Sequence, residues 1–227
     1  MTSRGDLRLP TVWGATPDEV ARHYPADDLL PGARLLTRAI SVAAPADLTW
    51  RWLCQIALAP YSYDWIDNRG RRSPQTLTPG ADRLELGQTM AVVFTLRSFD
   101  EGHRWTALTT PRGQLMFGPV AMTYAAEPDG AGSRIVCRLA VSARGPAARL
   151  RGHALAWGDL VMMRRQLLNL KALAERDSRP CLSIHGGAGR RPDHALAALP
   201  TLRRRPVCAR AGALPARAWT TPASTSN

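Results

Sequence analysis

Hydrophobic and polar residues alternate in five segments of the chain, which predicts five β-strands. In residues 34–43, Leu36, Ile40 and Val42 lie on one face and polar residues lie on the other. The same period of two recurs in four later segments separated by turn residues, at 88–99, 104–110, 118–127 and 133–144. Short turns between consecutive strands predict an antiparallel meander.

Two of these strands carry more specific expectations. The segment 88–99 is predicted as one continuous strand whose apolar side is formed by Met90, Val92, Phe94 and Leu96. In the segment 133–144, apolar residues alternate with Arg134 and Arg138. That strand is therefore expected to have one face buried and one face in water.

Two other segments follow the helical period instead. In residues 44–57, Leu48, Trp52 and Ile56 recur at a spacing of four, which predicts a short helix. Residues 151–176 form the longest periodic stretch, and a helix of that length spans about 39 Å. Its predicted broad apolar face consists of Leu150, Ala154, Trp157, Leu160, Val161, Met163, Leu167, Leu168 and Leu170.

Together these elements predict an α+β fold in which a curved antiparallel sheet wraps around one long C-terminal helix. A single helix cannot fill the concave side of a strongly curved sheet, so we expect a cavity lined by the apolar faces of both. Such a cavity is the usual site for a small molecule. Tyr124 on a strand and Trp157 on the long helix are candidate ligand contacts.

The stretch PYSYDWIDNRGRRSPQ, residues 60–75, concentrates aromatic side chains in a loop. Exposed aromatic rings are unfavourable unless their apolar bodies pack and their polar atoms find partners. The stretch is therefore predicted to form the rim or lid of the cavity, with Tyr61, Tyr63 and Trp65 as candidate ligand contacts. The alternative, a small local core that anchors the loop, stays open.

Two carboxylates are interleaved with these aromatic residues. Asp64 and Asp67 could act as a general acid and base. They could equally accept hydrogen bonds in turns, or pair with Arg69, Arg71 and Arg72, and this structural reading is favoured. Asp64 is retained as a candidate ligand contact.

Length and composition suit one globular domain with an appendage, or two small domains. The chain has 227 residues, of which 45% are hydrophobic, and a net charge of +12. Eight arginines and a single acid lie in residues 178–227, which are rich in Pro, Gly and Ala and are predicted to be a disordered tail. Residues 1–32 are predicted as an N-terminal extension packing on the domain, and residues 33–177 as the domain itself.

The charge alone does not make nucleic acid a favoured partner. The run TLRRRP could contact nucleic acid or anionic lipid through its charge. A solvated tail, or a stretch created by a shifted reading frame, accounts for it better.

The sequence contains no recognisable motif for binding a metal, a phosphate or a dinucleotide cofactor. The four cysteines and five histidines show no metal-ligand spacing, so we expect no metal, and no phosphate-binding or dinucleotide motif points to a cofactor. His153 could project toward the cavity, although a half-buried structural role is commoner. The apolar runs are too short for a membrane span. With no secretory signal, a reduced cytoplasmic protein is expected.

Three blocks of sequence also resemble a known superfamily. They are TRAISVAAPADLTWRWLCQIA, YSYDWIDNRGRRS and GDLVMMRRQLLNLKALAE, accompanied by WGATPDEV and PADDLLP nearer the N-terminus. Over residues 13–176 the chain is similar to the polyketide cyclase/dehydrase-like branch of the SRPBCC (START-like, helix-grip) superfamily. Arg51 and Ala57 depart from the branch, which often has proline and glycine there.

The resemblance implies a helix-grip fold with a hydrophobic ligand cavity, and it does not imply catalysis. The favoured hypothesis is a non-catalytic binding or transport protein for a lipid, polyketide or aromatic metabolite. The alternative is a polyketide cyclase/aromatase-like or hydrolase-like enzyme that uses the same cavity. The sequence does not indicate an oligomeric state.

Overall fold

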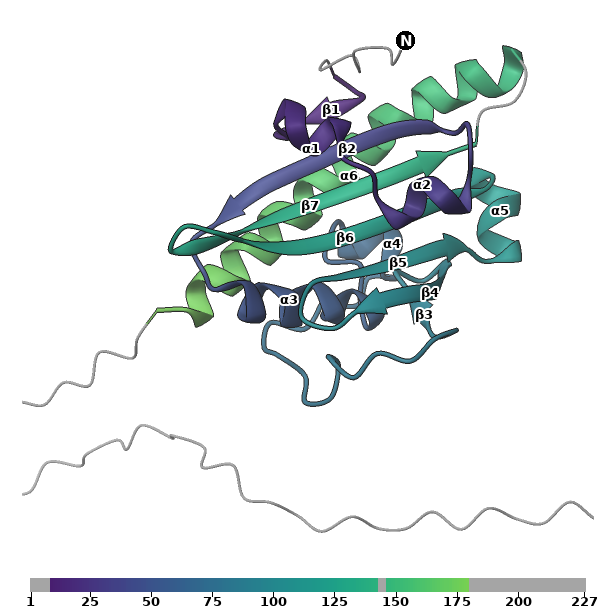
Figure 1. The fold of residues 1–227 in the computed structure, drawn as a ribbon. Helices are drawn as coiled ribbons and strands as arrows, with labels where there is room; N and C mark the ends of the chain where they lie inside the picture. The colour runs from purple at the N-terminus through teal and green to yellow at the C-terminus, as the bar shows by residue number, and fades with distance from the viewer. Residues whose placement is uncertain (1–8, 143–145, 180–227) are drawn as a thin grey trace, which may run out of the picture. The chain divides into compact units, whose positions relative to one another are not determined.

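The computed structural model describes residues 9–142 and 146–179, and in this part of the chain the strands form one sheet (Figure 1). Its order is β1-β2-β7-β6-β5-β4-β3. The strands are β1 (Val12–Trp13), β2 (Arg34–Val42), β3 (Thr89–Met90), β4 (Phe94–Asp100), β5 (Arg104–Thr109), β6 (Val120–Asp129) and β7 (Gly132–Val141). Only β1 and β2 pair in parallel; the other neighbours are antiparallel, which confirms the meander.

The helices follow the predicted order, with additions. They are α1 (Pro17–Ala21), α2 (Pro25–Leu29), α3 (Ala46–Cys54), α4 (Asp64–Asp67), α5 (Pro111–Phe117) and α6 (Pro146–Asp177). The α+β class, the mostly antiparallel open sheet and the long C-terminal helix are confirmed. The tail predicted for residues 178–227 lies almost wholly outside the described residues.

One side of the sheet packs against α3 and α6, and the main core lies there (Figure 1). We call this side the inner face. Its buried side chains come from every long strand and include Leu36, Leu96, Trp105, Ala107, Met122, Tyr124, Ile135, Cys137 and Leu139. Helix α3 adds Trp52 and Leu53, which are buried completely.

The apolar face of α6 is narrower than predicted. The main buried stripe recurs at alternating spacings of four and three and consists of Ala156, Leu160, Met163, Leu167, Leu170 and Ala174, with Leu173 buried beside it. Ala154, which was expected on this face, is exposed. Trp157, Val161 and Leu168 were expected there as well, but they are also exposed. Each of these three lies one residue after a buried position, which is about 100° further around the helix. Only the one stripe of buried residues therefore packs against the sheet.

The other side of the sheet, here called the outer face, is covered by α1 and α2 (Figure 1). The prediction that Arg138 faces water is therefore wrong, because its side chain is fully buried. It donates hydrogen bonds to the main-chain oxygens of Glu19, Val20 and Arg22, at 3.2, 2.8 and 2.7 Å. These oxygens lie at the C-terminal end of α1, where helical carbonyls lack partners within the helix.

The predicted strand over residues 88–99 is interrupted. Ala91 and Val92 adopt positive φ angles of 42° and 68°, and they form a turn between β3 and β4. The main-chain nitrogen of Ala91 donates to the carbonyl of Ile56, at 3.0 Å, instead of to a neighbouring strand. This contact turns Val92 outward, although its place in the alternating pattern predicts burial.

Candidate functional site

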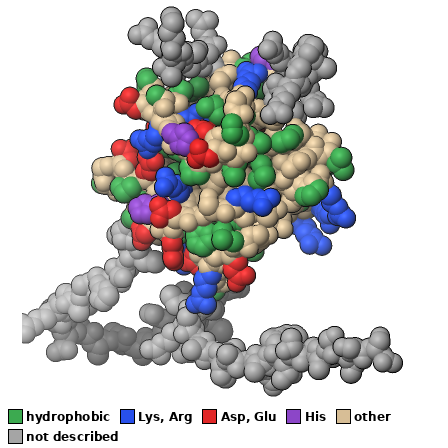
Figure 2. All heavy atoms as spheres, turned by 45° about the vertical axis from the view of Figure 1, so that its right-hand side comes forward, with side chains coloured by type: hydrophobic (Ala, Val, Ile, Leu, Met, Phe, Trp, Pro, Cys, Tyr) green, Lys and Arg blue, Asp and Glu red, His purple; other side chains and the backbone are tan. Residues whose placement is uncertain are grey.

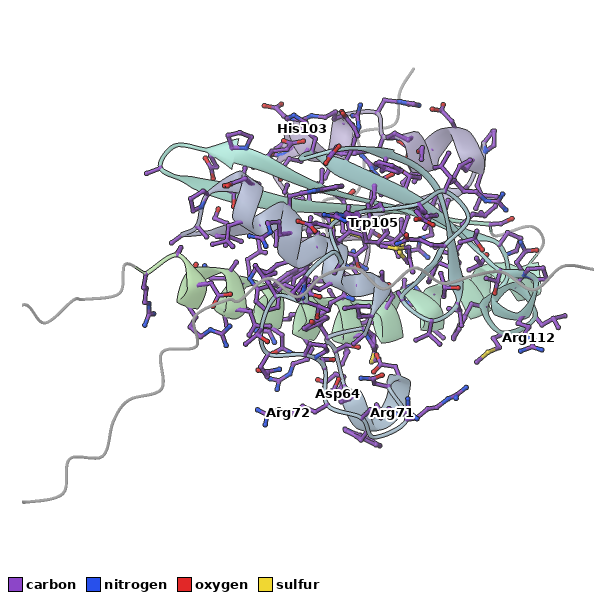
Figure 3. The ribbon with its side chains drawn as sticks, turned by 90° about the horizontal axis from the view of Figure 1, so that it is seen from below. Asp64, Arg71, Arg72, His103, Trp105 and Arg112 are labelled. Carbon is purple, nitrogen blue, oxygen red and sulfur yellow. The ribbon has the colours of Figure 1, made fainter. Side chains whose placement is uncertain are left out.

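Polar groups converge in the core between the inner face and α6. The ring of Tyr124, on β6, stacks on Trp105 of β5, with ring centroids 4.5 Å apart. The Tyr124 hydroxyl donates a hydrogen bond to Oε1 of Gln166 and lies 3.1 Å from the sulfur of Met163, both on α6. Figure 3 shows Trp105 between the sheet and the helix. Tyr124, predicted as a ligand contact, therefore lies in the interior.

Gln166 also connects this cluster to the aromatic loop. Its Nε2 atom donates to the carbonyl of Pro60, at 2.5 Å. One turn further along α6, Asn169 donates to the carbonyl of Tyr61, at 2.8 Å. Helix α6 thus links the sheet, through Tyr124, to the start of the loop 60–75.

A buried ion pair ties α6 to the edge of the sheet. Arg38 on β2 is fully buried, and its guanidinium lies 3.1 Å from a carboxylate oxygen of Asp159 on α6. The same guanidinium donates to the carbonyl of Thr11, at 2.7 Å. Burial raises the pKa of Asp159 to about 6, although the charge of Arg38 acts in the opposite direction.

The other ionisable groups of the interior are neutral at pH 7. Burial raises the pKa of the Tyr124 hydroxyl and of the Cys137 thiol well above their ordinary values. Tyr124 is therefore a hydrogen-bond donor and not a base, and Cys137 is not a thiolate nucleophile.

The loop residues predicted at the cavity rim occupy three different environments. Tyr61 is buried, packs edge-on against Trp52 with ring centroids 6.1 Å apart, and has a φ of 56°. Tyr63 is half-buried, whereas Trp65 on α4 is 76% exposed. Among the described residues, the hydroxyl of Tyr61 has no hydrogen-bond partner.

The two aspartates of the loop accept hydrogen bonds from nearby serines. Asp64 accepts from the main-chain nitrogen and the hydroxyl of Ser73, at 2.8 and 2.5 Å, which closes the loop. Asp67 accepts from the hydroxyl of Ser62. Figure 3 shows Asp64 with the neighbouring Arg71 and Arg72 beyond α6, on the side away from the sheet. These contacts favour the structural role over acid–base chemistry.

Trp157 does not join the interior cluster. It is 45% exposed on α6, and its indole nitrogen donates to Nε2 of His153, at 3.2 Å. His153, which could have faced the cavity, is likewise exposed. Neither residue meets Tyr124 across the inner face.

Sequence reasoning missed three polar members of the interior: Arg38, Asp159 and Gln166. A signal for Arg38 existed, because it shares the parity of Leu36 and Ile40 on β2 and so belongs to the inner face. Gln166 lies next to Leu167 in the buried stripe of α6, where a polar residue needs a partner.

The space expected to be a cavity is occupied by buried side chains, among them Trp105, Met122 and Met163. Two depressions lie at the outer face instead. One of about 330 Å³ is lined by Thr16, Glu19, Ser41, Glu127, Pro128, Asp129 and Arg134. Another of about 180 Å³ is lined by Asp100, His103, Arg104, Ala125 and Glu127. Their charged walls suit a hydrophobic ligand poorly.

Metal and membrane features were sought in the same residues. Within 9–142 and 146–179, no three His, Cys, Asp or Glu side chains are placed to hold a metal ion. Of the helices that the structure describes, none has the length and apolar character needed to cross a bilayer.

Solved structures of similar fold come from several organisms. Protein MLL2253 from Mesorhizobium loti is 13% identical, with a TM-score of 0.41, over 63% of this chain and 98% of its own. Protein NE0264 from Nitrosomonas europaea is 12% identical, with a TM-score of 0.40, over 63% of this chain and 95% of its own. At these identities the likeness does not bear on the ligand.

Family assignment rests on the sequence model instead. No curated protein matches the chain. The model for polyketide cyclase / dehydrase and lipid transport proteins matches residues 34–175, from the start of β2 almost to the end of α6. The chain therefore belongs to this family, within the SRPBCC superfamily.

Proposed function

We propose that the protein binds a hydrophobic small molecule, a lipid, polyketide or aromatic metabolite, between the inner face and α6, and does so without catalysis. Family and fold support a hydrophobic ligand-binding or polyketide cyclase-like protein. The observation that carries the proposal is the lining of the interior, which is apolar except for a few polar groups, among them the hydrogen-bonded pair Tyr124 and Gln166. Ligand sites commonly combine such a lining with a few placed polar groups.

The interior can adapt to a guest. Met90, Met122 and Met163, three of the six methionines in the chain, are buried there. Methionine side chains have three rotatable bonds and a polarizable sulfur, so they reshape around different partners more easily than branched residues. A ligand would enter by displacing these side chains and shifting α6 from the sheet.

Tyr124 and Gln166 are the groups that would orient the ligand. Both are buried, and their mutual hydrogen bond can be exchanged for one to a ligand carbonyl or hydroxyl. Tyr124 as a neutral phenol donates to a ligand oxygen, while the stacked ring of Trp105 offers an apolar surface. Tyr61 and Trp65 remain proposed contacts at the loop.

One observation favours a cyclase-like enzyme as the second candidate. Asp159, with a pKa of about 6, lies close enough to Tyr124 to influence its ionisation. A carboxyl group of that pKa can exchange protons near neutral pH. Its ion pair with Arg38 favours a structural role, because the guanidinium holds the carboxylate in place.

Native mass spectrometry of the gently purified full chain tests the proposal. We expect a stoichiometric apolar adduct, whose extraction and identification give the ligand class. Tyr124→Phe combined with Gln166→Leu should lower the occupancy of the adduct. Leu35→Ala is the control and should leave occupancy unchanged, because Leu35 is exposed and lies opposite Ala140 on the outer face.

Two results would count against binding without catalysis. A chain that carries no adduct and fails to take up fatty acids, flavonoids and polyketide mimics would refute the binding function. A chain that converts a polyketide mimic, with conversion lost in Asp159→Asn while binding persists, would establish the enzyme instead.

A further inference from the structure

Apolar side chains gather in water at the end of the sheet that carries α5. Leu115 is 90% exposed and Met116 is 66% exposed, and both Phe117 and Val92 are also exposed. Helix α5 adjoins the turn that presents Val92, because the main-chain nitrogen of Thr110 donates to the carbonyl of Val93, at 2.8 Å. We call these four exposed side chains (Val92, Leu115, Met116 and Phe117) the α5 patch.

The backbone holds this patch in position. The hydroxyl of Thr110 caps α5 by accepting from the main-chain nitrogen of Gly113, at 3.1 Å. A Cβ atom at Gly113 would lie 2.7 Å from the carbonyl oxygen of Val93, so only glycine permits this close seating. Val92 itself has a φ of 68°, an unfavourable conformation for a β-branched residue. The exposed apolar side chains therefore belong to a fixed element and not to a frayed end.

Positive charge accompanies the patch. Residues 102–126 contain no Asp or Glu, and Arg112 lies in the first turn of α5. Arg112 and Leu115 are three residues apart and so share one side of the helix. Figure 3 shows Arg112 at the end of the molecule that carries α5. In Figure 2 this side of the molecule is turned toward the viewer, and hydrophobic side chains lie there beside Lys and Arg.

We propose that the α5 patch inserts into the surface of an anionic lipid bilayer, with Arg112 at the level of the headgroups. Interfacial binding strengthens with the apolar area that enters the bilayer and with the attraction between basic residues and anionic lipids. A stable protein partner would need roughly 20–30 residues on each side, far more than the four side chains of the patch. The long arginine side chain can extend to the headgroups while its neighbours are buried.

This docking goes beyond the proposed ligand binding. It uses only the outside of the molecule, so vesicles can bind whether or not the interior holds a guest. Loss of docking would leave the ligand proposal intact, and an empty interior would leave the docking proposal intact.

The test is sedimentation of the full chain with vesicles of phosphatidylcholine containing roughly 30% phosphatidylglycerol, a content chosen to give an anionic surface. We expect Leu115→Ser combined with Met116→Ser to weaken binding by at least about tenfold. Arg112→Gln should weaken it about fivefold, an effect that high salt should abolish. Both variants should keep the circular dichroism spectrum of the parent.

Phe117→Ser should also weaken binding, and Phe99→Ser is its matched control, because Phe99 and Phe117 are each 38% exposed. Phe99 lies near the opposite end of β4, about 17 Å from Phe94 beside α5. The control should bind as the parent does, and every variant keeps the same C-terminal arginines. The proposal is wrong if the patch variants and the control bind equally, if the parent binds neutral vesicles equally well, or if the parent binds neither.

Discussion

The two faces of the sheet solve the problem of burying polar groups in different ways. On the outer face, Arg138 donates to three carbonyls, and Arg134 pairs with Glu19 at 2.7 Å. Burial opposes ionisation of Glu19, but hydrogen bonds from Arg134 and Thr16 outweigh it and lower its pKa. The inner face also buries an arginine, Arg38, which pairs with Asp159, but Tyr124 relies there on a single side-chain amide.

The difference extends to the size of the apolar side chains. The outer face uses Ala39, Ala121 and Ala140, which let α1 and α2 approach closely. The inner face uses large aromatic and methionine side chains that can rearrange. A closely seated face of small side chains suits a fixed scaffold, whereas a face with large adaptable groups suits an exchangeable partner. This difference supports placing the proposed ligand site on the inner face.

The largest effect should come from breaking the outer face. Arg138→Leu leaves the carbonyls of Glu19, Val20 and Arg22 without their donor, so we expect a loss of about 3 kcal/mol in unfolding free energy. Urea unfolding of the full chain measures it. Arg104→Leu, at an exposed site, should lose less than about 1 kcal/mol. Equal losses would mean that the contact with α1 contributes little.

The burial of Asp159 beside Arg38 should make the stability of the folded protein depend on pH. The pKa of Asp159 is raised from 3.8 to about 6 in the folded protein, so the folded state binds this proton more tightly than the unfolded state does. Its contribution to stability is present below pH 4 and is lost as the pH rises toward 6, by about 2 kcal/mol between roughly pH 4.5 and pH 7.

Comparison with Asp159→Asn isolates this contribution. Unfolding free energies of parent and variant at the two pH values give a difference of differences, from which other titrating groups cancel. We expect the parent to lose more stability than the variant as the pH rises. Parallel curves would show that Asp159 titrates near its ordinary value and that the pair is well hydrated.

Adjacent residues on β6 allow a direct comparison of the two faces. Tyr124→Phe and Thr123→Val each delete one buried hydroxyl, from the inner and the outer face respectively. Both should lose about 1 kcal/mol of unfolding free energy. Only Tyr124→Phe should also lower ligand occupancy in native mass spectrometry. A similar loss of occupancy in Thr123→Val would mean that general destabilisation, and not contact, controls binding.

The sequence was sufficient for the fold because hydrophobic periodicity reports which residues leave water. It identified β2 and α6 and gave the antiparallel order of β4 to β7. It failed where long-range contacts override the local pattern. Val92 is turned outward next to the hydrogen bond between Ala91 and Ile56, which are 35 positions apart in the sequence. Arg138 is buried by α1, which lies more than a hundred residues earlier in the chain.

The site was less predictable than the fold for the same reason. Tyr124 could be named from its strand, but its partner Gln166 is 42 residues away in the sequence. The aromatic loop was predicted as a cavity rim, and that role stays a prediction. Its residues nevertheless separate into buried Tyr61 and exposed Trp65, because α4 turns the second away from the core. Composition cannot distinguish these outcomes.

The smallest change in stability is expected for Tyr61, which is buried like a core residue but is also a proposed ligand contact. Its hydroxyl is buried and, within the described residues, makes no hydrogen bond, and burial raises its pKa. Removing an unpartnered buried hydroxyl relieves its desolvation cost, so Tyr61→Phe should be neutral or should gain up to about 1 kcal/mol in ligand-free protein. Urea unfolding after removal of bound small molecules measures this.

If the same substitution lowers ligand occupancy, the hydroxyl is held without a partner in order to meet the ligand. If it lowers the stability of the ligand-free chain instead, a water molecule or an alternative rotamer already satisfies it, and Tyr61 belongs with the fixed scaffold.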